Sequence, residues 1–287
     1  KMLTSYSSIY NLGHKAVAEL TKYPCLVEEK IDGSQISFGR FGDHYLLIRS
    51  KSAEIQLDYP PKMFNLAVEV IKNLDLKDGY TYRGEYLAKP KHNILAYSRV
   101  PINNIIIFDI NVGLEDYLSY DHKAEEAKRL GLEVVPHLWD GPVTLDVLKG
   151  LLEMESVLGG SLVEGVVIKP ADYSLFGRDK KVLMAKYVSE AFKETHRKEW
   201  VPRPGRDIVQ ALAQEVSTPA RWTKAIQHLR ETGQIEDSPR DIGLLLKEIS
   251  QDVEKEEVDY IKDKLYAHFK KDILRATVRG FPQWYKA

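Results

Sequence analysis

The sequence predicts an α+β protein in which a domain with a mixed or antiparallel sheet over residues 1–195 is followed by a small all-helical domain over 196–287. Two observations support this prediction. Short apolar or alternating runs, bounded by turn residues, recur up to about residue 190 with helical patterns between them. From Arg206 onward no alternating pattern occurs, and helix start signals take its place.

The first predicted hairpin lies around Lys30. The apolar run 25–27 leads into Glu-Lys-Ile-Asp-Gly-Ser at 29–34, and an alternating run follows at 35–38. This pattern indicates a strand, a tight Asp-Gly turn and a second strand. Lys30 then lies at a strand end beside a carboxylate and a glycine. A lysine attacks only when its pKa of about 10.4 is lowered, so the alternative is an ordinary exposed lysine.

Further strands are predicted at 44–51, 80–87 and 104–110, with a helix at 62–74 between the first two. The strand at 44–51 ends in charge, and the planar guanidinium of Arg49 suits a phosphate. Arg83 and Glu85 are two residues apart and should share one face of their strand. Asp109 ends a nearly all-apolar run, so it is either hydrogen-bonded there or functional.

The next elements are helices at 120–130 and 144–158, a short strand at 133–136, and strands at 162–170 and 181–188. Thr144 is the expected cap of its helix. Glu164 and Lys169 are five residues apart, so an ideal strand places them on opposite faces. If both serve one site, the strand must bend, or one residue must act beyond its end.

The second domain is predicted to contain helices at 206–216, 217–231 and 238–250, and one or two more at 251–279. Ser-Thr-Pro at 217–219 and Ser-Pro at 238–239 are start signals with proline in the first turn. The last helix is rich in cations. It is either a solvated face or a surface that lies along a phosphate backbone, formed by Lys262, Lys264, Lys270 and Lys271.

Composition limits the functions further. The net charge of −1 gives no overall basic field, so nucleic-acid binding would need a local patch. The one cysteine, Cys25, excludes an internal disulfide. No apolar run reaches the roughly 20 residues of a membrane span, and the first residues do not form a signal peptide. We therefore expect no membrane partner and a cytoplasmic or other reducing compartment (the host cytoplasm if the protein is viral).

Four motifs stand in a fixed order: Glu-Lys-Ile-Asp-Gly at 29–33, Tyr-Arg-Gly-Glu-Tyr-Leu at 82–87, Glu-Gly-Val-Val-Ile-Lys-Pro at 164–170 and Met-Ala-Lys at 184–186. Phe-Asp-Ile at 108–110 lies between the second and third. Over residues 25–190 the chain resembles the covalent nucleotidyltransferase superfamily of polynucleotide ligases and capping enzymes. More narrowly, it is similar to phage-type ATP-dependent RNA ligases that seal nicks in duplexes.

The resemblance implies a role for each motif residue. Lys30 would become adenylylated, Asp32 would orient the lysine and the metal, Glu85 would hold the ribose, and Phe108 would stack on adenine. Catalytic roles would also fall to Glu164 and Lys186. Lys169 and Lys186 would bind phosphates, and further contacts with the cofactor would come from Glu29, Ile31 and Arg49. Mg²⁺ or Mn²⁺ would be held, directly or through water, by Asp32, Glu85 and Glu164.

The implied substrate is RNA with 3′-hydroxyl and 5′-phosphate ends, with an RNA/DNA hybrid as a possible duplex. Arg49 and Lys51 would contact it together with the lysines of the last helix. One departure is Met184, where the family usually has the first lysine of Lys-x-Lys. The alternatives are an ATP-dependent DNA ligase, a GTP-using capping enzyme and a catalytically degenerate nucleic-acid-binding protein. The first two generally carry a β-barrel after the last motif, where this sequence predicts helices.

Overall fold

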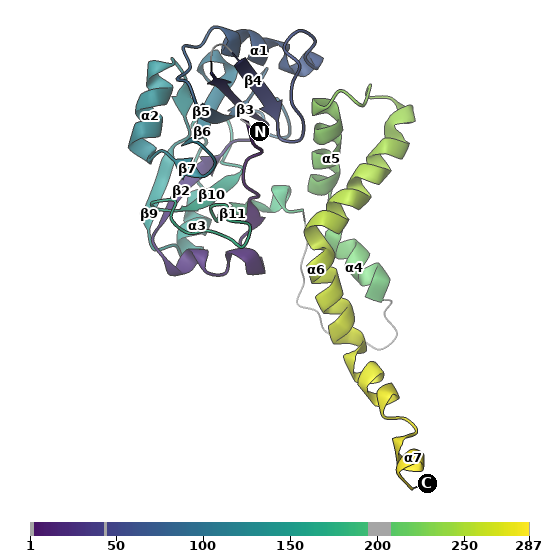
Figure 1. The fold of residues 1–287 in the computed structure, drawn as a ribbon. Helices are drawn as coiled ribbons and strands as arrows, with labels where there is room; N and C mark the ends of the chain where they lie inside the picture. Colours follow the sequence, from purple (N-terminus) through teal and green to yellow (C-terminus); the bar gives the residue numbers. More distant parts are fainter. Residues whose placement is uncertain (1–2, 43–44, 195–207, 287) are drawn as a thin grey trace. The chain divides into compact units, whose positions relative to one another are not determined.

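The computed structural model describes residues 3–42, 45–194 and 208–286 (Figure 1). The chain divides into two compact units. The first contains Lys1–Phe192 with Arg230–Gln234, and the second contains Lys193–Leu229 with Ile235–Ala287. The predicted domain boundary at 195–196 and the predicted helix start at Arg206 lie outside the described residues. No described helix is long and apolar enough to cross a membrane.

The first unit contains two sheets whose neighbouring strands are mostly antiparallel. One sheet has the order β1 (Tyr10–Asn11), β11 (Ala185–Val188), β10 (Gly165–Pro170), β2 (Cys25–Lys30) and β9 (His137–Gly141). The other has the order β4 (Tyr45–Ser50), β3 (Ser34–Phe41), β5 (Tyr80–Tyr86), β6 (Ile105–Val112) and β7 (Asp116–Tyr117). Parallel pairs join β1 to β11, and β6 to β8 (Glu133–Val134). The predicted α+β class with a mixed sheet is confirmed.

The helices of this unit cover the sheets. Helices α1 (Asn65–Lys72) and α2 (Tyr120–Arg129) share one apolar core with β3, β5 and β6. Helix α3 (Leu145–Leu152) and the 3-10 turns η1 (Lys15–Val17) and η2 (Leu20–Lys22) share another with β2 and β10. Further 3-10 turns are η3 (Lys62–Phe64), η4 (Ile102–Asn104) and η5 (Glu190–Phe192).

Helix α3 is shorter than the predicted 144–158. Thr144 caps it as expected, accepting a hydrogen bond from Val147 N at 3.3 Å. After Glu153 the chain turns back on itself, and Val163 N donates to Met154 O at 3.0 Å. The apolar residues at 154–158 that suggested more helix therefore belong to a loop closed by backbone bonds.

Strand alternation directs polar side chains into the space between the sheets. In β10, Val166 and Ile168 pack in the core with α3, so Val167 and Lys169 face the other way. In β5, Tyr82 and Tyr86 pack in the core with α1 and α2. Arg83 and Glu85 then share the opposite face, as predicted.

Strand β6 carries a bulge at Phe108. Asp109 pairs with Arg83 and Ile107 pairs with Gly84, which leaves Phe108 as the extra residue. Ile107 and Ile110 both pack in the core with α1 and α2. Phe108 and Asp109 lie between them and are both directed into the space between the sheets, where Phe108 joins two smaller apolar clusters.

The second unit contains α4 (Ile208–Val216), most of α5 (Pro219–Glu231), the turn η6 (Pro239–Asp241), α6 (Ile242–Thr277) and α7 (Phe281–Lys286). Both predicted start signals are used: Thr218 Oγ1 accepts from Arg221 N at 3.2 Å, and Ser238 forms a capping box with Asp241. The predicted helix end near Ser250 is wrong. No glycine or proline interrupts the chain there, and Ser250 Oγ donates to Leu246 O at 2.9 Å. Helix α6 therefore continues to Thr277 and has 36 residues in all.

Candidate active site

A small cavity of about 50 Å³ lies between the two sheets. Its walls come from β2, β3, β5, β6 and β10 and from the first residues of the chain. It is lined by Tyr6, Ile9, Glu28, Glu29, Lys30, Ile31, Gln35, Glu85, Phe108, Val135, Val167 and Lys169. The structure thus brings together six residues that the sequence singled out: Glu29, Lys30, Ile31, Glu85, Phe108 and Lys169.

Lys30 and Glu164 form an ion pair at the edge of this cavity. Lys30 Nζ lies 2.7 Å from Glu164 Oε1, and the two side chains are 27% and 8% exposed. Lys30 is the last residue of β2 and pairs with Gly165, the first residue of β10. Glu164 therefore contacts Lys30 from just before the first residue of β10. This is one of the two arrangements expected if Glu164 and Lys169 serve one site.

Gly165 makes the close approach of these strands possible. A Cβ at this position would lie 2.6 Å from Tyr187 O and 2.8 Å from Val188 Cα. Because both contacts are to backbone, no side-chain movement could relieve them. The glycine of the Glu-Gly-Val-Val motif is thus required by strand packing beside Glu164.

The charges around Lys30 determine its protonation. Burial alone lowers the pKa of Lys30, but the carboxylates of Glu164 and Glu85 outweigh it and hold the pKa above the usual range. Burial raises the pKa of Glu85 to about 8 and also raises the pKa of Glu164. In this state Lys30 is an ammonium without a free electron pair, so attack requires a change that weakens its pairing with Glu164.

Two carboxylate oxygens beside Lys30 are buried without a hydrogen-bond partner among the described residues: Glu85 Oε2 and Glu164 Oε2. A third, Glu29 Oε1, lies at the same cavity. Carboxylate oxygens are the ligands that Mg²⁺ and Mn²⁺ prefer. The oxygens of Glu85 and Glu164 have the chemistry that such a cation requires, and their metal roles stay predictions.

Asp32 is held by the chain rather than directed at Lys30. Its Oδ2 accepts hydrogen bonds from Ile94 N and Leu95 N, both at 2.8 Å, and its own N–H donates to the Tyr97 hydroxyl at 2.9 Å. These bonds fix the turn after Lys30 against the loop 88–97. The metal role of Asp32 stays a prediction.

The same loop holds the rest of the turn. Asn93 Nδ2 donates to Gly33 O at 2.9 Å, and His92 Nε2 lies 2.9 Å from Ser34 Oγ. Burial lowers the pKa of His92 to about 4, so its ring is neutral near pH 7. Because His92 Nδ1 accepts from Ala88 N, Nε2 carries the proton and donates to Ser34.

Arg49 and Lys186 do not line the cavity. Lys186 pairs with Val167 across β11 and β10, and directly opposed residues share a face of the sheet. It is therefore on the face that carries Lys169. Arg49 is half-buried on β4, opposite Ser37, and its Nε donates to Ser50 O at 3.3 Å.

The predicted RNA contacts outside the cavity lie on exposed surfaces. Lys51 is exposed just after β4. The helix lysines lie on the C-terminal half of α6, where most side chains are exposed, and they are Lys262, Lys264, Lys270 and Lys271. These roles stay predictions.

Lys169, expected to bind phosphate, is only 1% exposed and is surrounded by protein acceptors. Its Nζ lies 2.5 Å from Glu28 Oε2, 2.9 Å from Phe108 O and 3.0 Å from Asp109 Oδ2. An ammonium has three protons, and here each has an acceptor. A phosphate contact would need one of these bonds to break, and that role stays a prediction.

Sequence reasoning missed the other members of this cluster. Lys123 on α2 is fully buried, with Nζ 2.5 Å from Glu28 Oε1 and 2.7 Å from Phe108 O. One signal could have revealed Glu28: it is an acidic residue directly after the apolar run 25–27, in a strand whose other residues indicate burial. Lys123 shares the inner face of its helix with Ala127, four residues on, which the sequence shows only once the core face is known.

Met184 packs in a cluster of aromatic rings. It is buried with Tyr173, Val182 and Tyr6. The Tyr6 hydroxyl donates its proton to the Asp109 carboxylate and lies 2.8 Å from Met184 Sδ. Position 184, where the phage-type RNA ligases usually have a lysine, is thus apolar in this chain.

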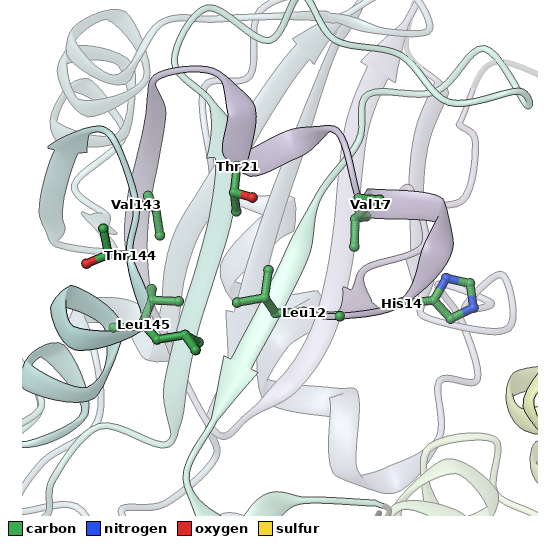
Figure 2. A pocket seen from close by; sticks show the side chains of 10 residues that line it. Leu12, His14, Val17, Thr21, Val143, Thr144 and Leu145 are labelled. Carbon is green, nitrogen blue, oxygen red and sulfur yellow. The ribbon is translucent and has the colours of Figure 1, made fainter.

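A larger cavity of about 330 Å³ lies elsewhere in the first unit, beside α3 (Figure 2). Figure 2 shows its walls, which come from the chain around η1 and η2 and from the start of α3. They include Leu12, Val17, Val143 and Leu145. No acid or lysine lines it, so the smaller cavity, which holds Lys30, is the candidate active site.

Comparison with known proteins identifies the family of the chain. A family model described as RNA ligase matches residues 24–188. Among solved structures, a mutant apo form of Naegleria gruberi RNA ligase is similar with a TM-score of 0.46 and 17% identity. A form of that ligase with pyrophosphate has a TM-score of 0.45 and 17% identity. In each case the match covers 67% of this chain and 57% of the other. None of the curated proteins matches the sequence.

Proposed function

The chain belongs to the RNA ligase family, and from this we propose that it is an ATP-dependent RNA ligase. It joins 3′-hydroxyl and 5′-phosphate ends through a lysyl-AMP on Lys30 and an adenylylated RNA. The proposed substrate is a nick in an RNA duplex or RNA/DNA hybrid. The observation that carries the proposal is the pairing of Lys30 with Glu164 beside a cavity that also contains Glu85 and Phe108.

In the first step the Lys30 nitrogen attacks the α-phosphorus of ATP. A P–N bond forms, the bond to the bridging oxygen breaks, and pyrophosphate leaves. In the second, a 5′-phosphate oxygen of RNA takes AMP from Lys30. In the third, a 3′-hydroxyl attacks that phosphate and AMP leaves. Each step concentrates negative charge on phosphorus oxygens, which nearby cations stabilise.

Mg²⁺ or Mn²⁺, when bound, would stabilise this charge and favour the free amine of Lys30. Glu85 and Glu164 would hold the cation, since each has a buried oxygen without a partner among the described residues. Glu164 would then share its charge between the cation and Lys30, which weakens its hold on the lysine proton. Asp32 would contribute by fixing the turn that follows Lys30.

The remaining residues would bind the nucleotide and the RNA. Phe108 would stack on the base, and Glu85 would accept from the ribose hydroxyls. The backbone and side chains of Glu29 and Ile31 would border the base in the cavity. Arg49 and Lys186 would contact phosphates, and RNA would extend over Lys51 and the lysines of α6.

Incubation with α-³²P-labelled ATP, and separately GTP, with Mg²⁺ tests the proposal on a denaturing gel. Label from ATP that is absent in Lys30→Ala and kept in Lys22→Ala, an exposed lysine, would support it. Label from GTP would indicate capping chemistry. No label from either would favour a degenerate binding protein. Sealing of nicked RNA, hybrid and DNA duplexes then identifies the nucleic acid.

A further inference from the structure

Four charged side chains meet behind the candidate active site: Glu28 of β2, Asp109 of β6, Lys123 of α2 and Lys169 of β10. None is more than 1% exposed. We name them the buried charge cluster. Two carboxylates and two ammonium groups make it neutral as a whole.

The cluster is bonded throughout. Glu28 joins the two lysines, with Oε1 2.5 Å from Lys123 and Oε2 2.5 Å from Lys169. Asp109 lies 3.0 Å from Lys169 and 3.6 Å from Lys123. Its oxygens also accept hydrogen bonds from two hydroxyl groups, those of Tyr6 and Tyr173. Despite burial, the two lysines hold the pKa of Asp109 below its usual range.

The cluster acts on Phe108 in two ways. Lys123 and Lys169 both donate to its carbonyl oxygen, at 2.7 and 2.9 Å. The Lys169 ammonium also lies 5.9 Å from the centre of the Phe108 ring. Phe108 is the extra residue of the bulge in β6, where the regular ladder does not hold the chain. These two donors therefore replace strand pairing in fixing the residue.

Burial of such a cluster is a weak source of stability, because desolvation offsets most of the attraction between the charges. Its position suggests another use. Glu28, Lys169 and Phe108 line the cavity, whereas Lys123 does not. Lys123 is fully buried and contacts the cavity lining through Glu28 and the Phe108 carbonyl.

We propose that Lys123 and Glu28 are positioning residues that hold Phe108 and Lys169 in place for the nucleotide base. The inference rests on the proposed function. Lys123 and Lys169 together balance Glu28 and Asp109, so the two carboxylates can hold Lys169 without leaving a net negative charge. Loss of Lys123 leaves Lys169, which already contacts both carboxylates, as the one cation of the cluster, and the net charge of −1 draws it toward Glu28 and Asp109 and away from Phe108.

The adenine base of ATP is remote from the α-phosphorus that reacts. Its contacts with the protein should therefore be equally strong in the ATP complex and in the transition state. Loss of such uniform binding raises KM and leaves kcat unchanged. For Lys123→Met we expect the KM for ATP in self-adenylylation to rise about tenfold, the effect of one charged hydrogen bond. The kcat should stay within about threefold of the wild type.

The double variant Glu28→Gln/Lys123→Met provides the rescue. It leaves Lys169 paired with Asp109 in a neutral cluster, and the amide oxygen introduced in place of the Glu28 carboxylate can still accept from Lys169. Its KM should return to within about threefold of the wild type. Lys128→Met, on the exposed face of the same helix, is the matched control and should change neither constant.

The experiment measures initial rates of labelling against ATP concentration for the wild type and these variants, with thermal unfolding of each. An unchanged KM in folded Lys123→Met, or a loss confined to kcat, would overturn the inference. If Lys123→Met does not fold, the single variant Glu28→Gln decides: a folded protein with an unchanged KM refutes the inference, and one with a raised KM supports it. If the wild-type protein takes no label, the proposed function is contradicted instead. The Kd for ATP, measured by calorimetry, then tests whether affinity falls in Lys123→Met and returns in the double variant.

Discussion

Removing the charge of Glu164 should increase the fraction of Lys30 that is present as the free amine in the absence of metal and nucleotide. The pair is the only strong contact that the structure describes for the Lys30 ammonium, at 2.7 Å. Glu164→Gln keeps the size of the side chain and an oxygen that can accept from Lys30. The substitution therefore isolates the charge, and we expect the pKa of Lys30 to fall.

The size of the fall follows from the geometry. Two unit charges 2.7 Å apart attract by about 6 kcal/mol at an effective dielectric constant of about 20, or about 4 pKa units. Three features reduce this value. The Lys30 side chain is 27% exposed, glutamine keeps the hydrogen bond, and Glu85 still contributes negative charge. We therefore expect a fall of about 2 units, or about 100-fold more free amine at a given pH.

Competitive acetylation measures this directly. The protein is treated with trace acetic anhydride from pH 7 to 11, and the labelled fraction of each lysine is read by mass spectrometry. The Lys30 curve should move to lower pH in Glu164→Gln. The curve of Lys22, an exposed lysine paired with Glu19, is the internal control and should not move.

Added Mn²⁺ should shift the wild-type curve in the same direction and have less effect on Glu164→Gln. A Lys30 curve that is the same in both proteins would refute the electrostatic account. It would mean that burial, rather than Glu164, determines the protonation of the lysine.

Further predictions concern stability and RNA binding. With a pKa of about 8 in the fold and about 4.3 unfolded, Glu85 binds more protons in the native state between these values, so stability falls as pH rises through that window. Glu85→Gln should therefore equal the wild type near pH 4 and exceed it by up to about 5 kcal/mol at pH 8 in urea unfolding, and a constant difference would contradict this. Gly165→Ala should lose about 2 kcal/mol or more, because its Cβ would lie 2.6 Å from Tyr187 O, whereas Gly150→Ala on α3 has open space and should gain up to about 1 kcal/mol. Replacing four lysines of α6 by alanine should weaken RNA binding while self-adenylylation stays unchanged; the four are Lys262, Lys264, Lys270 and Lys271. The slope of the logarithm of the RNA binding constant against the logarithm of the salt concentration should become less steep by about 3. An unchanged slope would exclude this surface as an RNA contact.

Much of the fold could be predicted because its signals are local. The strands on either side of Lys30, the helix caps at Thr144 and Thr218, and the shared face of Arg83 and Glu85 each depend on residues within a few positions of one another. The predicted pairing of the two strands as a hairpin is wrong, because β2 and β3 belong to different sheets. The grouping of Lys30, Glu85 and Phe108 at one cavity followed from the order of motifs and the resemblance they carry. These features needed no knowledge of which strands pair.

Other features depend on pairing and could not be read from one sequence. The bulge at Phe108 exists only relative to β5, so alternation alone would place Phe108 and Asp109 on opposite faces. The burial of Lys123 depends on which face of α2 meets the sheet. The three acceptors around Lys169 come from two other strands, and a motif residue expected to meet phosphate thus appears in a network of protein groups.

The bulge in β6 also limits how the length of this chain can vary. Deleting one residue between Ile105 and Val112 would restore a regular ladder with β5 and reverse the alternation on one side of the deletion. If the register with α2 were kept, the Asp109 carboxylate would turn toward Ile107 and Ile110 and away from both lysines. We therefore expect β6 to tolerate a conservative substitution better than the deletion of a single residue. The number of residues in β6 is as strict a requirement of the site as their chemical identity.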